Sequence, residues 1–155
     1  MDVKYINPFI ESVLANLKQF GNIEAEKESL DIFKDKQTKT EISSIIGITG
    51  NLKGSAVISF PKPLAIKIAS SMLMDDNITE VNDEVKDAIG EFSNIVIGNA
   101  RNKIVDNGIN IKISPPTIVV GENHKIFFPP NIPVIEVIFN AGDSKFYIII
   151  GLKEK

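Results

Sequence analysis

The chain has 155 residues, of which 43% are hydrophobic and 24% charged, and these values predict one ordinary globular domain over residues 1–155. The net charge is −3 and the basic residues are scattered among acids, so nothing indicates the basic stripe that nucleic-acid binding requires. Cysteine is absent, which excludes disulfides and thiol nucleophiles. No apolar run reaches the roughly 18 residues of a membrane span, and residues 1–20 mix apolar with charged side chains, unlike a secretory signal. We therefore expect a cytoplasmic protein.

The first half of the chain predicts one helix and a set of strands. Residues 7–20 carry apolar side chains at helical spacing, with Pro8 suited to the first turn and Gly21 to the end. Residues 23–33 favour an edge strand, and 34–40 form a charged loop. Residues 41–49 and 55–60 predict two strands joined by a turn at Gly50. The glycine-rich stretch between them is not a phosphate-binding loop, because Lys53 precedes Gly54 and a strand follows.

Two further helices follow. Residues 62–74 predict a short helix, and Asp75 to Glu80 form an acidic connector that lacks the ligand pattern of a calcium loop. Residues 82–107 predict a long helix, with Asn82 as its N-cap and Asn107-Gly108 at its C-terminal end. Its apolar side chains fall on one side at 100° per residue: Val85, Ile89, Phe92 and Val96.

The rest of the chain predicts strands at residues 109–114, 117–120, 125–128, 134–139 and 146–152, separated by Pro- and Gly-containing turns. Residues 146–150 are apolar on both faces, which indicates a central strand or one buried in an oligomer. His124 is expected in an exposed turn without a catalytic role. The order of elements predicts an α+β fold, in which helices at about 7–20, 62–74 and 82–107 cover one face of a largely antiparallel sheet.

A second face of the long helix is the candidate working surface. Asp87, Glu91, Asn94 and Gly98 lie within an arc of about 60°. Gly in a helix interior costs about 1 kcal/mol relative to Ala, so a helix that only packs does not need it there. These residues alone are also typical of a solvated helix face. The sequence has no Ser-His pair, metal-binding motif or paired acid and base.

One reaction fits a carboxylate and a carboxamide without a nucleophile. Hydrolysis of a phosphoryl group can be limited by the placement of a water molecule, and an amide side chain is suited to orient that water. The carboxylate of Glu91 would then attract a cation of the partner protein.

Three segments together resemble the CheC/CheX/FliY family of chemotaxis phosphatases: GITGNLKGSAVISF at 47–60, AIGEFSNIVIGN at 88–99 and ISPPTIVVG at 113–121. The family signature is an acidic or serine residue, then Glu-x-x-Asn four positions on, then a proline about twenty residues later. Here these positions are Asp87, Glu91, Asn94 and the pair Pro115-Pro116. Members with two active surfaces repeat the motif in the first helix. This chain has Leu14 where that helix would need an amide, so it looks most like the CheX branch.

The resemblance implies a phosphatase that dephosphorylates the phosphorylated response regulator CheY. Asn94 would orient the attacking water, Glu91 would pair with a lysine of the receiver, and Asp87 and Gly98 would contact the partner. Mg²⁺ would be held by the receiver, so the chain itself would bind no cofactor. The resemblance also implies a homodimer whose sheets join, for which the apolar strand at 146–150 is a candidate. Asn99 is expected to make a buried polar contact.

Two alternatives stay open. One is a non-catalytic module of the same fold that binds a receiver or a flagellar switch component. The other is a small-molecule-binding or structural dimer, which would require the resemblance to be accidental.

Overall fold

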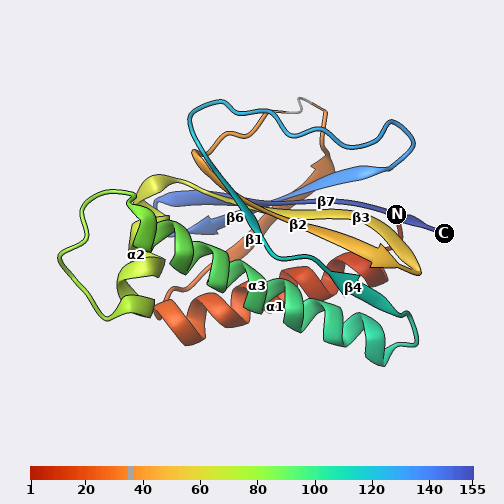
Figure 1. The fold of residues 1–155 in the computed structure, drawn as a ribbon, viewed down its shortest axis with the longest axis horizontal. Helices are drawn as coiled ribbons and strands as arrows, with labels where there is room; N and C mark the ends of the chain where they lie inside the picture. Colours follow the sequence, from red (N-terminus) through yellow and green to blue (C-terminus); the bar gives the residue numbers. More distant parts are fainter. Residues whose placement is uncertain (35–36) are drawn as a thin grey trace.

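The computed structural model describes residues 1–34 and 37–155, and in this part of the chain three helices cover one face of a seven-stranded antiparallel sheet (Figure 1). In chain order the elements are α1 (Val3–Gly21), β1 (Glu26–Ile32), β2 (Ile42–Gly50), β3 (Leu52–Phe60), α2 (Lys62–Leu73), α3 (Asp83–Asp106), β4 (Ile111–Ile113), β5 (Thr117–Val120), β6 (Val134–Ala141) and β7 (Ser144–Glu154). The strand order is β1-β6-β7-β3-β2-β4, and β5 also pairs with β2. The predicted α+β fold is confirmed. No helix within these residues is long and apolar enough to cross a membrane.

The central strand β7 is apolar on both faces because each face of the sheet has its own core. Ile148 and Ile150 point toward the helices, whereas Ile149 packs on the opposite side with Val57 and Ile126. Both edges of β7 are hydrogen-bonded, one to β3 and the other to β6. The prediction of a central strand is therefore confirmed, but β7 cannot be the strand through which two sheets join, so that prediction is wrong.

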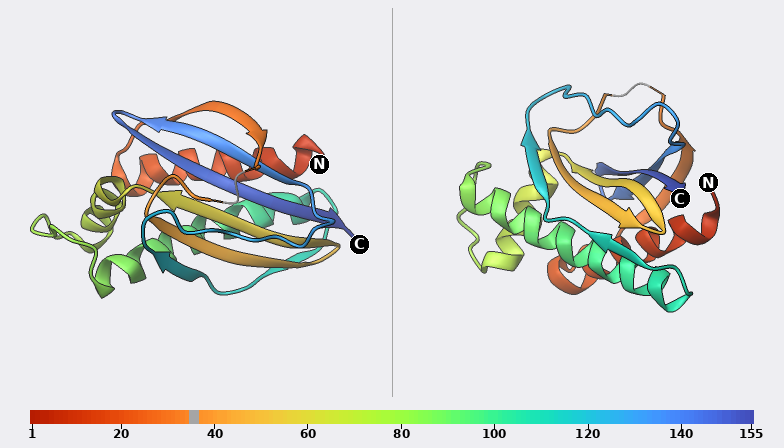
Figure 2. Two further views of the ribbon diagram at one scale, coloured as in Figure 1. Left: turned by 90° about the horizontal axis from the view of Figure 1, so that it is seen from above. Right: turned by 45° about the vertical axis from the view of Figure 1, so that its right-hand side comes forward.

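The helix α1 begins earlier than predicted, at Val3 instead of residue 7. The side chain of Asp2 caps it by accepting a hydrogen bond from the backbone N–H of Lys4. Pro8 therefore lies inside the helix and not in its first turn, and it removes one helical hydrogen bond. The Tyr5 hydroxyl donates to the carboxylate of Glu154, which raises the pKa of Tyr5 to about 12. This contact joins the two ends of the chain, which lie on the same side of the molecule in Figure 2.

Residues 121–133 cross the face of the sheet that the helices leave open (Figure 1). The predicted strand at 125–128 is absent; Lys125 forms only an isolated bridge with Gln37. Apolar packing replaces strand pairing here, and a Cβ at Gly151 would come within 2.5 Å of the ring of Phe128. The face of the sheet opposite the helices is therefore covered by a loop and not by another strand.

The predicted exposed turn is present at Glu122 and Asn123, but His124, which follows it, is half-buried and not exposed. Its Nδ1 donates to the carbonyl of Gly121 at 2.8 Å, and its Nε2 lies 2.6 Å from the Oγ of Ser43 on β2. The histidine thus fastens the loop to the sheet through contacts between residues far apart in sequence. The charged loop predicted at 34–40 includes residues 35–36, which lie outside the described residues.

Candidate functional site

The helix α3 is anchored at both ends, as its sequence predicts. The Oδ1 of Asn82 accepts a hydrogen bond from the backbone N–H of Val85 at 2.9 Å, and two acids lie in the first turn, where the helix dipole favours them. Beyond the other end, Gly108 has φ +92°, a conformation that glycine adopts without strain. These local signals set the length of the helix.

The inner face of α3 is the predicted apolar stripe, and all four of its members are fully buried: Val85, Ile89, Phe92 and Val96. The ring of Phe92 packs edge-on against Phe60 of β3, with ring centroids 6.0 Å apart. Burying a large apolar side chain contributes about 1.5–3 kcal/mol. The outer face of α3 is therefore carried on a helix held firmly against the sheet.

The outer face presents the predicted site residues as one strip, here called the polar strip. Asp87, Glu91 and Asn94 are exposed, and Gly98 is half-buried on the same side of the helix. Within the described part of the chain, neither Glu91 nor Asn94 forms a hydrogen bond or ion pair with another residue. Their side chains are thus available to groups outside this chain.

The glycines of α3 differ in their surroundings. A Cβ at Gly98 would meet nothing within 4 Å, so no packing among the described residues requires glycine there. A Cβ at Gly90 would lie 3.6 Å from side-chain atoms of Pro116 and Ile118, an ordinary contact. Gly98 therefore leaves an uncovered strip of helix backbone beside Asn94.

The structure brings together the three sequence segments that carry the family resemblance. The backbone N–H of Gly47 donates to the Oγ of Ser114 at 2.8 Å, and the N–H of Ser114 donates to the carbonyl of Gly47 at 2.9 Å. These bonds hold the gap between β4 and β5, both of which pair with β2. The adjacent Pro116 then reaches α3 at Gly90, one residue before Glu91. The Ser-Pro-Pro segment thus links the sheet edge to the site helix.

A shallow groove of about 550 Å³ runs from Asn94 along the C-terminal half of α3 and is bordered by Lys112 of β4. Arg101 also lines it, and its Nε donates to the backbone carbonyl of Ile111 at 3.0 Å. The sequence analysis did not identify either basic residue. Arg101 could have been found, because it lies seven residues after Asn94 on the same helical face. Lys112 could not, because its position depends on how β4 packs beside the helix.

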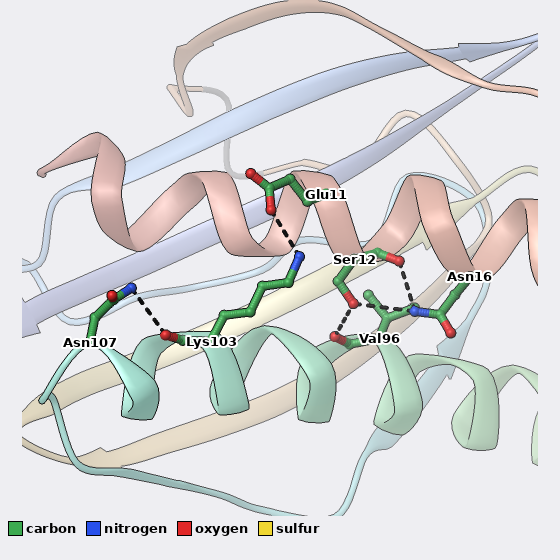
Figure 3. Close-up of polar contacts among 6 residues, drawn as sticks. All are labelled: Glu11, Ser12, Asn16, Val96, Lys103 and Asn107. Atoms are coloured by element: carbon green, nitrogen blue, oxygen red, sulfur yellow. Dashed lines mark hydrogen bonds and ion pairs between the residues drawn. The ribbon is translucent and has the colours of Figure 1, made fainter.

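The first helix carries no second copy of the site. Glu11 is paired with Lys103 of α3, with 2.8 Å between Oε2 and Nζ (Figure 3). Leu14, three residues on, is half-buried and packs on the core. The expectation of a single motif is consistent with this geometry. The prediction for Asn99 is wrong, since that side chain is exposed.

A polar side chain of α1, Ser12, instead binds α3. The buried Oγ of Ser12 donates to the carbonyl of Val96 at 2.6 Å, and Asn16 Nδ2 donates to the backbone carbonyl of Ser12 at 2.8 Å (Figure 3).

The described residues contain no group of three or more acids and histidines placed to hold a metal ion.

Comparison with known proteins defines the class of this fold and site. A model of the family "Chemotaxis phosphatase CheX" matches residues 42–140, a range that includes the polar strip and the Ser-Pro-Pro segment. The chain therefore belongs to the CheX family of chemotaxis phosphatases.

Individual relatives agree with this membership. The chain is 29% identical over 126 residues to the CheY-P phosphatase CheX of Thermotoga maritima, a match that covers 81% of each protein. The structure of a CheC-like superfamily protein from Shewanella sp. PV-4 superposes with a TM-score of 0.91 at 33% identity, over 99% of both chains. The chemotaxis protein CheX from Vibrio vulnificus superposes with a TM-score of 0.88 at 29% identity, over 96% of this chain and 99% of the other.

Proposed function

We propose that this chain is a phosphatase that removes the phosphoryl group from the aspartyl phosphate of a CheY-type response regulator. The observation that carries the proposal is the Glu91–Asn94 pair, which projects from a rigid helix without internal partners in a chain of the CheX family. The Thermotoga maritima relative is a phosphatase of phosphorylated CheY.

In the proposed reaction, Asn94 positions the nucleophile. Its amide offers both a donor and an acceptor, which together can hold one water molecule in line with the bond to be broken. The water oxygen bonds to phosphorus, the bond from phosphorus to the aspartyl oxygen breaks, and its electron pair regenerates the receiver's carboxylate. The products are the unmodified aspartate and inorganic phosphate, which carries away the protons of the water.

The other residues of the polar strip bind the receiver. Glu91, one turn before Asn94, pairs with a lysine of the receiver through a charge-assisted contact. Asp87 adds a second carboxylate on the same side, and Gly98 lets the receiver approach the helix backbone. Mg²⁺ would be held by the receiver's own carboxylates, where it would offset the charge of the phosphoryl oxygens, so this chain would contribute no ligand. We place the reaction in the cytoplasm.

The experiment is release of inorganic phosphate from a phosphorylated, Mg²⁺-loaded CheY-type receiver by the wild-type chain and by Asn94→Ala. We expect the substitution to lower kcat about 10²–10³-fold, the usual cost of removing one positioned polar group. The circular dichroism spectrum and the midpoint of urea unfolding should not change, because Asn94 is exposed. Asn99→Ala, an exposed Asn five residues further along α3 that borders the same groove, is the control for loss of an amide beside the site and should keep wild-type kcat.

Two results would contradict the proposal. Equal rates for wild type and Asn94→Ala would remove Asn94 from the reaction. A wild-type chain that binds the phosphorylated receiver without accelerating its hydrolysis would favour the non-catalytic binding module.

We also propose that two copies of the chain pair through β1. It is an edge strand whose seven residues are all exposed, and Leu30 and Ile32 are 43% and 63% exposed. An exposed apolar edge is a template for pairing with another strand. The other edge of the sheet is interrupted between β4 and β5 by Pro115-Pro116, which suits pairing less well.

Light scattering during size-exclusion chromatography tests this proposal. We expect the wild type to have the mass of a dimer and the double variant Leu30→Lys, Ile32→Lys to have the mass of a monomer, since lysines on an edge strand oppose pairing. A wild-type monomer, or a dimer that survives both lysines, would contradict it.

A further inference from the structure

We propose that Arg101 and Lys112 form a basic docking subsite that binds a carboxylate side chain of the phosphorylated receiver and sets the direction in which the receiver lies along α3. The inference rests on the proposed function and extends it from the chemistry at Asn94 to the recognition of the partner.

The position of Arg101 relates this subsite directly to the site of hydrolysis. It follows Asn94 by seven residues, which places it on the same face of α3 and about 10 Å further along the helix axis. Its Nε is bonded to the carbonyl of Ile111 at 3.0 Å, and one terminal nitrogen donates to Asn102 Oδ1 at 3.2 Å. These bonds hold the half-buried guanidinium in one orientation, while its other N–H groups remain available for a carboxylate.

Lys112 approaches the same groove from the sheet. It is exposed on the short strand β4 and borders the groove that Arg101 also lines. Neither cation forms an ion pair with an acid in the described part of the chain. Lys103, on another side of α3, differs because it is paired with Glu11. Two uncompensated positive charges at the edge of one groove favour an anionic occupant.

Side chains of opposite charge lie on the two sides of Asn94. The acids Asp87 and Glu91 lie on the N-terminal side of Asn94, whereas Arg101 lies on its C-terminal side and Lys112 borders the groove that contains both Asn94 and Arg101. A receiver docked in one direction along α3 can satisfy both ends, but in the reverse direction it would face like charges. Such an arrangement of charges fixes the position of the receiver along α3 and disfavours wrong partners more than it raises the affinity for the receiver.

The occupant is a carboxylate and not the transferred phosphoryl group. The phosphoryl group must lie at Asn94, whereas the backbone of Arg101 lies about 10 Å further along the helix axis, and its Nε is held at the carbonyl of Ile111 on β4. The groove is open and shallow, which suits a side chain on a protein surface better than an enclosed small molecule. We therefore assign it to an Asp or Glu on the receiver surface outside the phosphorylated aspartate itself.

Steady-state release of phosphate from the phosphorylated receiver tests the assignment with Lys112→Glu and Arg101→Gln. We expect KM to rise about tenfold or more for Lys112→Glu and less for Arg101→Gln, with kcat within about twofold of wild type, because these residues bind and do not react. The matched control is Lys67→Glu, the same charge change at an exposed lysine on α2 outside the groove. It should leave KM near the wild-type value.

Charge-reversal variants of the acidic residues near the receiver's phosphorylation site then identify which carboxylate occupies the subsite. In the supporting result, one Asp→Lys or Glu→Lys receiver variant restores a low KM with Lys112→Glu and raises KM with the wild type. Equal changes in KM for Lys112→Glu and Lys67→Glu, or a loss in kcat alone, would overturn the subsite. If the wild type shows no turnover, the proposed function fails, and titration of the same variants with the phosphorylated receiver still decides whether the subsite binds it.

Discussion

The helices α1 and α3 lie side by side beneath the sheet, yet they use the same kinds of polar residue in opposite ways. Each has an exposed glutamate near its middle, followed within two residues by a buried serine. On α1, Glu11 is paired with Lys103, and Ser12 bonds the backbone of α3. On α3, Glu91 has no internal partner among the described residues, and the next residues of the strip face outward. The helix α1 holds α3 in place, and α3 presents its outer face to a partner.

The comparison separates side chains that hold α3 in place from side chains that are available to a partner protein. Ser12 Oγ, which accepts from Asn16, donates to the carbonyl of Val96, two residues after Asn94 on another side of α3, so α1 stabilises the helix on which Asn94 is carried. The position three residues after Glu11 holds Leu14, which is committed to the core, whereas the corresponding position after Glu91 is the exposed Asn94. Among the described residues, Glu91 is therefore available to a partner protein, whereas Glu11 is neutralised by Lys103.

Replacing each glutamate tests this difference most strongly. For Glu91→Gln we expect KM for the phosphorylated receiver to rise about tenfold or more, because a charge-assisted contact with the partner is lost. Glu11→Gln should leave KM unchanged and lower the free energy of unfolding by no more than about 1 kcal/mol, the usual range for an exposed ion pair. Phosphate release and urea unfolding measure the two effects. Equal KM values for both variants would remove Glu91 from the interface.

The contact between the helices is tested by Ser12→Ala. This change leaves the side chain of Asn16 and the carbonyl of Val96 with one buried hydrogen bond fewer, so we expect a loss of about 1–2 kcal/mol in the free energy of unfolding. For a chain of this length that corresponds to a fall of about 3–6 °C in the melting temperature. Calorimetry measures it, and kcat should stay near wild type. A tenfold loss of kcat with unchanged stability would contradict a purely structural role.

The smallest expected effect concerns Gly98. Gly98→Ala should raise the free energy of unfolding by about 0.5–1 kcal/mol, because alanine favours the helix and its methyl group meets nothing within 4 Å. If the receiver approaches the backbone there, KM should rise a few-fold. Gly90→Ala is the matched control, since its methyl group meets Pro116 and Ile118 at ordinary distance; it should leave KM unchanged. An unchanged KM for Gly98→Ala would place Gly98 outside the interface.

Sequence reasoning succeeded where the signal is local and periodic. The limits of α3, its buried stripe and the exposure of Glu91 and Asn94 follow from capping residues and helical spacing, and all agree with the structure. It failed at Pro8, because the Asp2 cap was not recognised and the helix begins before the proline. It also failed at 125–128, where the apolar residues pack on the outer face of the sheet without forming a strand.

The sequence by itself determined the class of fold, the strip of Asp87, Glu91, Asn94 and Gly98, and the family, because these depend on spacing along one helix and on three short segments. Only the tertiary structure decided which glutamate is neutralised, how the Ser-Pro-Pro segment reaches the site helix, and that Lys112 shares a groove with Arg101. The physical reason is that helical periodicity relates residues within a few turns, whereas these contacts join residues 11 to 92 positions apart through the packing of separate elements.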